Sequence, residues 1–232
     1  KHLPCSVLLP IHQHCRHLKM LDAQLNLSIP KIKTLWQQIV IAKIQNQARC
    51  LKFCHIEESS KLELLAKKVA SGDPANVEAV AAARYFKALF GTHFSRGSET
   101  IVNSALNYGY AIIRGVVARK LAVYGFEPSI GIHHHNELNP FNLADDLIEP
   151  FRPIVDLFVV MNIDEKDDLD LTPTLKHSLL NLLNVNIDSN GEQHSLAYAI
   201  EREVQSLSRC FLTDETKLYK IKIVELRQHR YE

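Results

Sequence analysis

The feature that most constrains the fold is a long segment, residues 99–124, which would be apolar on nearly every side of a helix. A helix without a solvent-facing side has to be surrounded by other elements, so we expect it at the centre of the domain. Its polar exceptions recur every three or four residues and form one stripe, which consists of Asn103, Asn107, Tyr110 and Arg114. Buried polar groups need partners, so this stripe either faces a metal pocket or a phosphate, or forms internal hydrogen bonds.

Further helices are expected before and after this central one. Helix caps, prolines and apolar periodicity place them at residues 28–53, 57–70, 73–90, 143–161, 172–185 and 195–211. The helix over 143–161 should bend near Pro150 and Pro153. The tail is either a short strand or a frayed helix. We therefore predict a mainly α fold, with residues 1–10 as the remnant of a small N-terminal β domain, 11–29 as a linker and 30–232 as a helical domain.

Composition excludes several classes of protein. The chain has 232 residues, of which 46% are hydrophobic and 23% charged, as expected for a globular protein with a sizeable core. No apolar run is long enough to span a bilayer and no leader peptide is recognisable, so we expect a cytoplasmic protein without a membrane partner. The five cysteines are odd in number and are expected to be small buried residues rather than disulfides or zinc ligands.

The charged residues lie in blocks, although the net charge is only +1. Residues 1–53 hold eight Lys and Arg against one Asp, and residues 84–126 hold six against one acidic residue. Residues 127–170 hold two basic residues against eleven acidic ones. A basic framework around an acidic pocket suits a protein that holds phosphates while binding a divalent metal, although solvated helix faces would give the same pattern.

The stretch from Gly131 to Asp156 is the richest in potential metal ligands. It begins with three consecutive histidines, 133–135, and continues into a helix that carries Asp145, Asp146 and Glu149 on neighbouring positions. Carboxylates that close repel one another, so a fold that gathers them beside imidazoles usually binds a cation there. Glu78 stands alone on an alanine-rich helix, where a solvated charge is the ordinary interpretation.

Four motifs carry a resemblance to a known family. They are LWQQIVIAKIQNQA at 35–48, NVEAVAAARYFKALFG at 76–91, NSALNYGYAIIRGVVARKLAVYGFEPSIGIHH at 103–134 and NPFNLADDLIEPFRPIVD at 139–156. Over residues 3–211 the chain resembles CRISPR-associated protein one, the spacer-acquisition integrase, in the form found in type II systems. The resemblance implies an N-terminal β domain that dimerises the protein, most of which would be absent here, and a helical catalytic domain at 30–232.

The resemblance also implies the site and the reaction. Matched by motif, the metal ligands and catalytic residues are Glu78, His134 and Glu149, with Asp146 as a supporting acid and Mg²⁺ or Mn²⁺ as the metal. In an extended segment His134 would face the pocket while His133 and His135 face away. If the segment is instead a turn, this alternation fails and only the motif match favours His134. The implied activity is that of a metal-dependent DNA endonuclease and integrase, which joins the 3′-OH ends of captured spacer DNA to the repeat by transesterification.

Partners follow from the same resemblance. They are double-stranded DNA, as spacer fragment and CRISPR repeat, and CRISPR-associated protein two, in the cytoplasm of a prokaryote, with a homodimer expected when the N-terminal domain is complete. From their positions we expect four residues to contact DNA, namely Arg84, Asn103, Tyr110 and Arg114.

Two other functions remain open. The chain would be a DNA-binding scaffold if its site were degenerate, which the joint presence of Glu78, His134 and Glu149 argues against. It would be a metal-carboxylate helical bundle acting on a small molecule if its helices carried paired Glu-x-x-His motifs, and the sequence lacks them.

Overall fold

The computed structural model describes residues 17–164, 170–189 and 191–229, and its fold is mainly helical, as predicted. The expected β remnant at 1–10 lies outside the described residues. Within the expected linker at 11–29, His17–Leu25 forms helix α1. The buried face of α1 carries Met20 and Gln24, and the Gln24 side chain donates to the carbonyls of Glu127 and Ile130 at 3.1 and 3.3 Å. Packing of this kind gives the segment a fixed place that a linker would lack.

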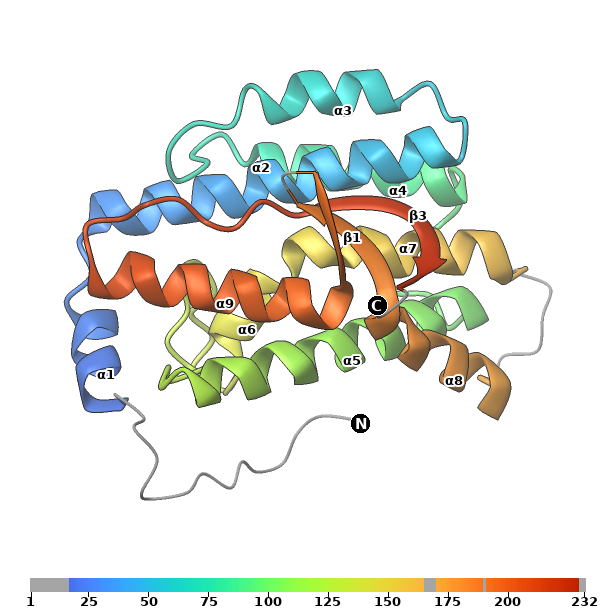
Figure 1. Ribbon diagram of the computed structural model, residues 1–232. Coiled ribbons are helices and arrows are strands. Elements are labelled where there is room, and N and C mark those ends of the chain that lie inside the picture. The colour runs from blue at the N-terminus through green and yellow to red at the C-terminus, as the bar shows by residue number, and fades with distance from the viewer. Residues whose placement is uncertain (1–16, 165–169, 190, 230–232) are drawn as a thin grey trace.

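The helix expected at the centre is α5, Ile101–Val123, and α6, α7, α8 and α9 contact it, although it lies along the lower side of the helices in the view of Figure 1. The helix is capped by Thr100, whose hydroxyl accepts from the Asn103 backbone N–H at 3.2 Å. Gly109 allows α7 to approach closely, since a Cβ there would lie 2.4 Å from Cγ1 of Val155. The two helices can therefore pack at this distance only with glycine at this position.

Helix α2, Ile29–Phe53, begins after Ser28 and contacts α3, Ser59–Ala66, and α4, Val77–Phe90. The α4 helix starts later than its sequence predicts. Asp73 has a left-handed backbone and lies outside the helix, but its carboxylate accepts from the N–H groups of Val77 and Glu78, each at 2.9 Å. Asp73 thus stabilises the first turn of α4 from outside it, and fixes the backbone that carries Glu78.

The predicted bend at Pro150 and Pro153 is confirmed. The chain passes from α6, Asn142–Leu147, through the 3-10 turn η1, Glu149–Phe151, into α7, Arg152–Asn162. A proline lacks the N–H that a continuous helix needs, so the change of direction falls where the prolines stand. The bend presents η1 to α2, which it contacts.

The C-terminal part contains a small sheet. After α8, Pro173–Asn181, and the 3-10 turn η2, Leu182–Asn184, come β1, Val185–Ser189, and β2, Glu192–Ser195. Helix α9, Leu196–Leu212, separates them from β3, Lys222–Gln228. The order is β2-β1-β3 and both pairings are antiparallel. The sequence predicted the turn at 190–191 but not the two strands that it joins, and of the two alternatives for the tail, the strand is correct.

The segment between α9 and β3 runs back along α2 (Figure 1). The Gln38 side chain binds it twice, donating to the Thr216 carbonyl at 2.6 Å and accepting from the Leu218 N–H at 3.0 Å. Buried Asn46 donates to the carbonyls of Pro150 and Ile221 at 2.8 and 3.2 Å and accepts from the Ile223 N–H at 3.2 Å. One amide of α2 therefore joins η1 to the C-terminal segment.

Among the helices of the described residues, none is both long enough and apolar enough to cross a membrane.

Candidate active site

Lys43 joins two of the three predicted ligands. Its ammonium group, on α2, forms an ion pair with Glu78 of α4 and another with Glu149 of η1, where Nζ and Oε2 are 2.5 Å apart. Lys43 is 8% exposed and Glu149 is 6% exposed, so both charges are removed from water. The structure thus brings together two carboxylates that are distant in the sequence, and it places a cation between them.

The electrostatics of this cluster are self-consistent. Burial opposes the charged form of Lys43, but the carboxylates of Glu149 and Glu78 outweigh it and raise the lysine pKa. Burial alone would raise the pKa of Glu149, yet Arg152 and Lys43 together lower it. The Arg152 guanidinium donates from Nε to Oε1 of Glu149 at 2.8 Å. Glu149 is therefore ionised, with one basic group at each oxygen.

Asp146 anchors the loop that carries the histidines. Its carboxylate is completely buried and accepts from the backbone N–H groups of Ile132, His133 and His134, at 2.6, 3.0 and 3.2 Å. The same carboxylate lies 2.7 Å from Nδ1 of His134, and this hydrogen bond raises the histidine pKa against the effect of burial. Asp146 thus orients the His134 ring. This is a way in which Asp146 could play the supporting role predicted for it.

The histidine run is a turn and not an extended segment, so the alternation of side chains expected of an extended segment does not apply. The His133 ring stacks on Trp36 of α2, with centroids 4.0 Å apart and planes 2° apart, and the His134 ring meets the edge of Trp36 at 6.2 Å. His135 is exposed. Asp146 accepts hydrogen bonds from three successive backbone N–H groups, and they can reach one carboxylate only if the backbone forms a tight loop instead of an extended strand. His133 and His134 therefore lie on the same side, around one indole.

Gly131 is the position that makes this loop possible. A Cβ there would lie 2.3 Å from the His134 carbonyl oxygen and 2.9 Å from Oδ2 of Asp146. We expect Gly131→Ala to push His134 away from Asp146, so that the His134 pKa falls toward the ordinary histidine value. An NMR titration of the histidine ring protons measures this. Gly97→Ala is the control, because the nearest atom there is 3.8 Å away. An unchanged His134 pKa in Gly131→Ala would contradict this account of the loop.

The polar stripe of α5 finds internal partners along its whole length. Arg96 donates to the side-chain oxygens of Asn103 and Asn107 at 2.6 and 2.7 Å. Tyr110 donates to Asp156 of α7. Arg114 donates to Asn139 at 2.8 Å and forms an ion pair with Asp145 at 2.8 Å.

The four expected DNA contacts differ in exposure. Asn103 and Tyr110 are 3% and 6% exposed, and the Arg114 side chain is 16% exposed. The Arg84 side chain is half exposed, with Glu58 at 3.6 Å. DNA contact by these residues stays a prediction, and Arg84 is the one of the four that could make it without a rearrangement.

Asp156 supplies a test by pH. It is 1% exposed and accepts from the hydroxyls of Tyr85 and Tyr110, and burial raises its pKa to about 6 in spite of these bonds. Because the Asp156 pKa is higher in the folded state than in the unfolded state, protonated Asp156 adds to the free energy of unfolding. This contribution is complete below the unfolded pKa and is lost as pH rises through about 6.

We therefore expect the wild type to lose roughly 2 to 3 kcal/mol of unfolding free energy relative to Asp156→Asn between pH 4 and pH 7. Urea unfolding at several pH values measures the difference. Asp214→Asn, at an exposed position, is the control and should follow the wild type. Parallel pH profiles for the wild type and Asp156→Asn would contradict the prediction.

The residues fit a divalent metal in their chemistry. Two carboxylates already converge on a cation, and Asp146 holds Nδ1 of His134, which leaves Nε2 as the ring nitrogen that could bind a metal. Among the described residues, no group of three His, Cys, Asp or Glu side chains is close enough to hold a metal ion, and Lys43 stands between Glu78 and Glu149. Sequence reasoning missed Lys43, although a lysine close to the apolar positions Ile39 and Ile44 was a usable signal.

Comparison with known proteins identifies the family. The sequence profile described as "CRISPR associated protein Cas1" matches residues 7–181. A relative from Neisseria meningitidis serogroup C (strain 8013), named CRISPR-associated endonuclease Cas1, is 44% identical over an alignment 234 positions long, which covers 99% of this chain and 77% of the relative.

Two solved structures share the fold at lower identity. A chain of a casposase bound to integration product has a TM-score of 0.73 and 22% identity, over 94% of this chain and 75% of that one. A chain of a partial Cas6-RT-Cas1–Cas2 complex has a TM-score of 0.71 and 21% identity, over 91% of this chain and 74% of that one. Since the profile spans most of the sequence and the Neisseria relative is similar along nearly all of it, the chain belongs to the Cas1 family.

Proposed function

We propose that this protein is a divalent-metal-dependent DNA endonuclease and integrase, which joins the 3′-OH ends of captured DNA to a CRISPR repeat by transesterification. One observation carries the proposal: Glu78 and Glu149, from two elements distant in the sequence, converge on one cation, and Glu149 is near enough to the anchored His134 to help raise its pKa. The endonuclease name of the Neisseria relative and the integration product in the casposase structure agree with it.

Glu78, Glu149 and Nε2 of His134 would hold the metal. When bound, Mg²⁺ or Mn²⁺ would supply positive charge to a phosphate oxygen and lower the pKa of the attacking hydroxyl. Two carboxylates suit Mg²⁺, and the imidazole also suits Mn²⁺. No cysteine takes part in this ligand set.

The other residues of the site position these groups. Asp146 fixes the tautomer and the direction of the His134 ring, because its carboxylate accepts the Nδ1 proton. Asp73 fixes the first turn of α4, and Arg152 fixes Glu149. Lys43 keeps the two glutamates together and offers a positive charge at the place where a phosphate would approach. Arg84 is proposed to hold the DNA backbone.

The proposed partners are a DNA duplex, a repeat-bearing DNA and CRISPR-associated protein two, which is consistent with the Cas1–Cas2 complex among the structures of this fold. A homodimer through a complete N-terminal domain and a location in a prokaryotic cytoplasm stay predictions.

Strand transfer tests the proposal directly. The protein and CRISPR-associated protein two are incubated with a fluorescent duplex and a supercoiled repeat plasmid, with Mn²⁺ or with EDTA. We expect label to join the plasmid in Mn²⁺ alone, and Glu149→Gln to abolish the joining. Binding of the duplex without any joining under all these conditions would favour the scaffold function and contradict the proposal.

A further inference from the structure

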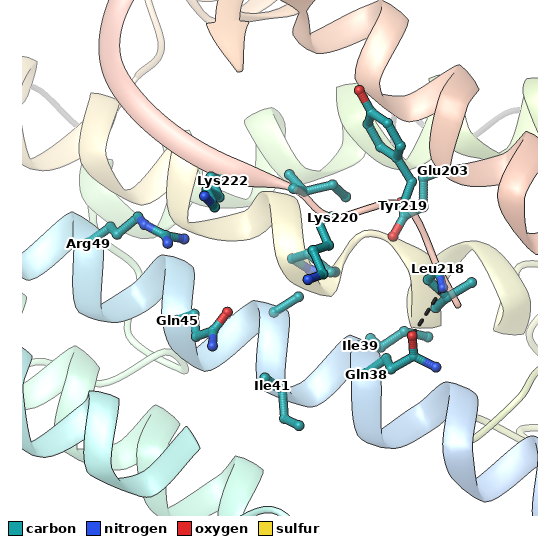
Figure 2. A pocket seen from close by; sticks show the side chains of 13 residues that line it. Gln38, Ile39, Ile41, Gln45, Arg49, Glu203, Leu218, Tyr219, Lys220 and Lys222 are labelled. Carbon is teal, nitrogen blue, oxygen red and sulfur yellow. Dashed lines mark hydrogen bonds between the residues drawn. The ribbon is translucent and has the colours of Figure 1, made fainter. Parts of the chain in front are cut away.

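A second polar site lies between α2 and the C-terminal segment. It is a cavity of about 420 Å³, which we call the tail cavity. Figure 2 shows the side chains that line it. One wall is the face of α2 that carries Ile39, Ile41 and Ala42, and the other is the segment from Leu218 to Lys222. The volume is in the range of pockets that bind small organic ligands. None of the residues assigned to the candidate active site lines it.

The deep polar group of the tail cavity is Glu203 of α9. This residue is 2% exposed, and its Oε2 has no hydrogen-bond partner among the described residues. An unpartnered buried carboxyl costs free energy, and native folds keep such groups mainly where a ligand or water satisfies them. Burial also raises the pKa of Glu203 well above its ordinary value and so favours the neutral carboxylic acid, which can both donate and accept a hydrogen bond.

The opposite end of the tail cavity is basic. Arg49 and Lys222 lie together at one end of the view, Glu203 lies at the other, and Lys220 lies between them (Figure 2). Lys220 and Lys222 are exposed, and neither is paired with an acidic side chain among the described residues. Glu63 and Asp188 act electrostatically on Arg49, but neither lines the cavity, and Glu203 is the one acid among its described lining residues. Three basic groups in the lining therefore favour an anion over amines and metal cations.

These two ends define the ligand. The basic rim requires an anionic group, the apolar walls require a flat or apolar body, and Glu203 requires a deep group that both donates and accepts hydrogen bonds. An alkyl chain would leave Glu203 unsatisfied, and inorganic phosphate would leave the walls empty. A nucleobase joined to a phosphate meets all three requirements, because every base has an edge with adjacent donors and acceptors.

We propose that the tail cavity binds one unpaired nucleotide, with its base at Glu203 and its phosphate at Arg49, Lys220 and Lys222. This site is distinct from the proposed strand-transfer centre and does not depend on it. The nucleotide comes either from solution or from the unpaired end of a DNA strand, since both present the same base and phosphate.

Calorimetry of the full chain with deoxyadenosine monophosphate in EDTA tests the proposal. We expect saturable binding, retained within about threefold in Glu203→Gln, whose amide also donates and accepts, and weakened on the order of tenfold or more in Glu203→Leu. Because a core substitution can affect folding, Lys220→Glu with Lys222→Glu is the second variant, and it should weaken binding similarly. Lys217→Glu, in the same exposed segment but outside the cavity lining, is its control and should bind as the wild type.

Three results would overturn the proposal: no saturable binding, equal binding of inorganic phosphate, or equal weakening by Lys217→Glu. Competition then distinguishes the two sources. A single strand that displaces the mononucleotide better than a blunt duplex identifies a strand end, and a mononucleotide that no DNA displaces identifies the free nucleotide. Glu78→Ala, which should not join strands, should still bind, so failure of one activity leaves the other testable.

Discussion

Replacing Glu149 by alanine is expected to reduce strand transfer on the order of a hundredfold or more, because a metal ligand and several kcal/mol of charge stabilisation are lost together. Glu78→Ala and His134→Ala should have similar effects. Any two of these substitutions combined should add little, since residues that act as one metal site are not additive. Integration rates in Mn²⁺ and the Mn²⁺ affinity of each variant are the measurements.

Two matched controls make this result specific. Glu137→Ala removes an exposed acid of the same loop, and His135→Ala removes an exposed histidine of the run. Both should keep most of the activity. The assignment fails if His135→Ala is inactive while His134→Ala still binds Mn²⁺ and joins DNA.

Lys43→Met is expected to destabilise the protein by roughly 3 kcal/mol in EDTA, because buried carboxylates lose the cation between them. Mn²⁺ should restore much of this loss, so the stabilisation by Mn²⁺ should be larger for Lys43→Met than for the wild type. Urea unfolding with EDTA and with Mn²⁺ measures both quantities.

The control for Lys43→Met is Lys61→Met, which removes one ion pair of an exposed lysine with Glu58. It should change stability little and should not alter the response to Mn²⁺. If Lys43→Met is as stable as Lys61→Met in EDTA, or gains no more than the wild type from Mn²⁺, Lys43 does not hold the two glutamates in place.

The sequence predicted the features that depend on neighbouring residues. Ser28 before Pro30 marks the start of α2, and Pro150 and Pro153 mark the bend before α7, since caps and prolines act within one turn. The packing of α5 against several helices was expected from its sequence, which is apolar apart from one polar stripe. The motif match named Glu78 and Glu149, and the structure brings both to Lys43.

The features that the sequence did not predict depend on distant contacts. The β1 and β2 strands are short. Their sheet is completed by β3, which follows α9 in the sequence and pairs with β1. The His133 side chain was expected to turn away from His134 in an extended segment. Instead, the backbone N–H groups of both histidines donate to Asp146, and in the resulting turn the His133 ring stacks on Trp36. No local pattern indicates that Lys43 would lie between two glutamates, because that depends on how three separate elements pack.

The Asn46 amide connects the C-terminal segment to the turn that carries Glu149. It binds the carbonyl of Pro150, the residue after Glu149, and also both Ile221 and Ile223. A displacement at either end changes the length or angle of bonds to the same side chain. A partner or ligand that moved the C-terminal segment would therefore strain the same side chain that holds the turn carrying Glu149, so binding at one place is expected to be felt at the other.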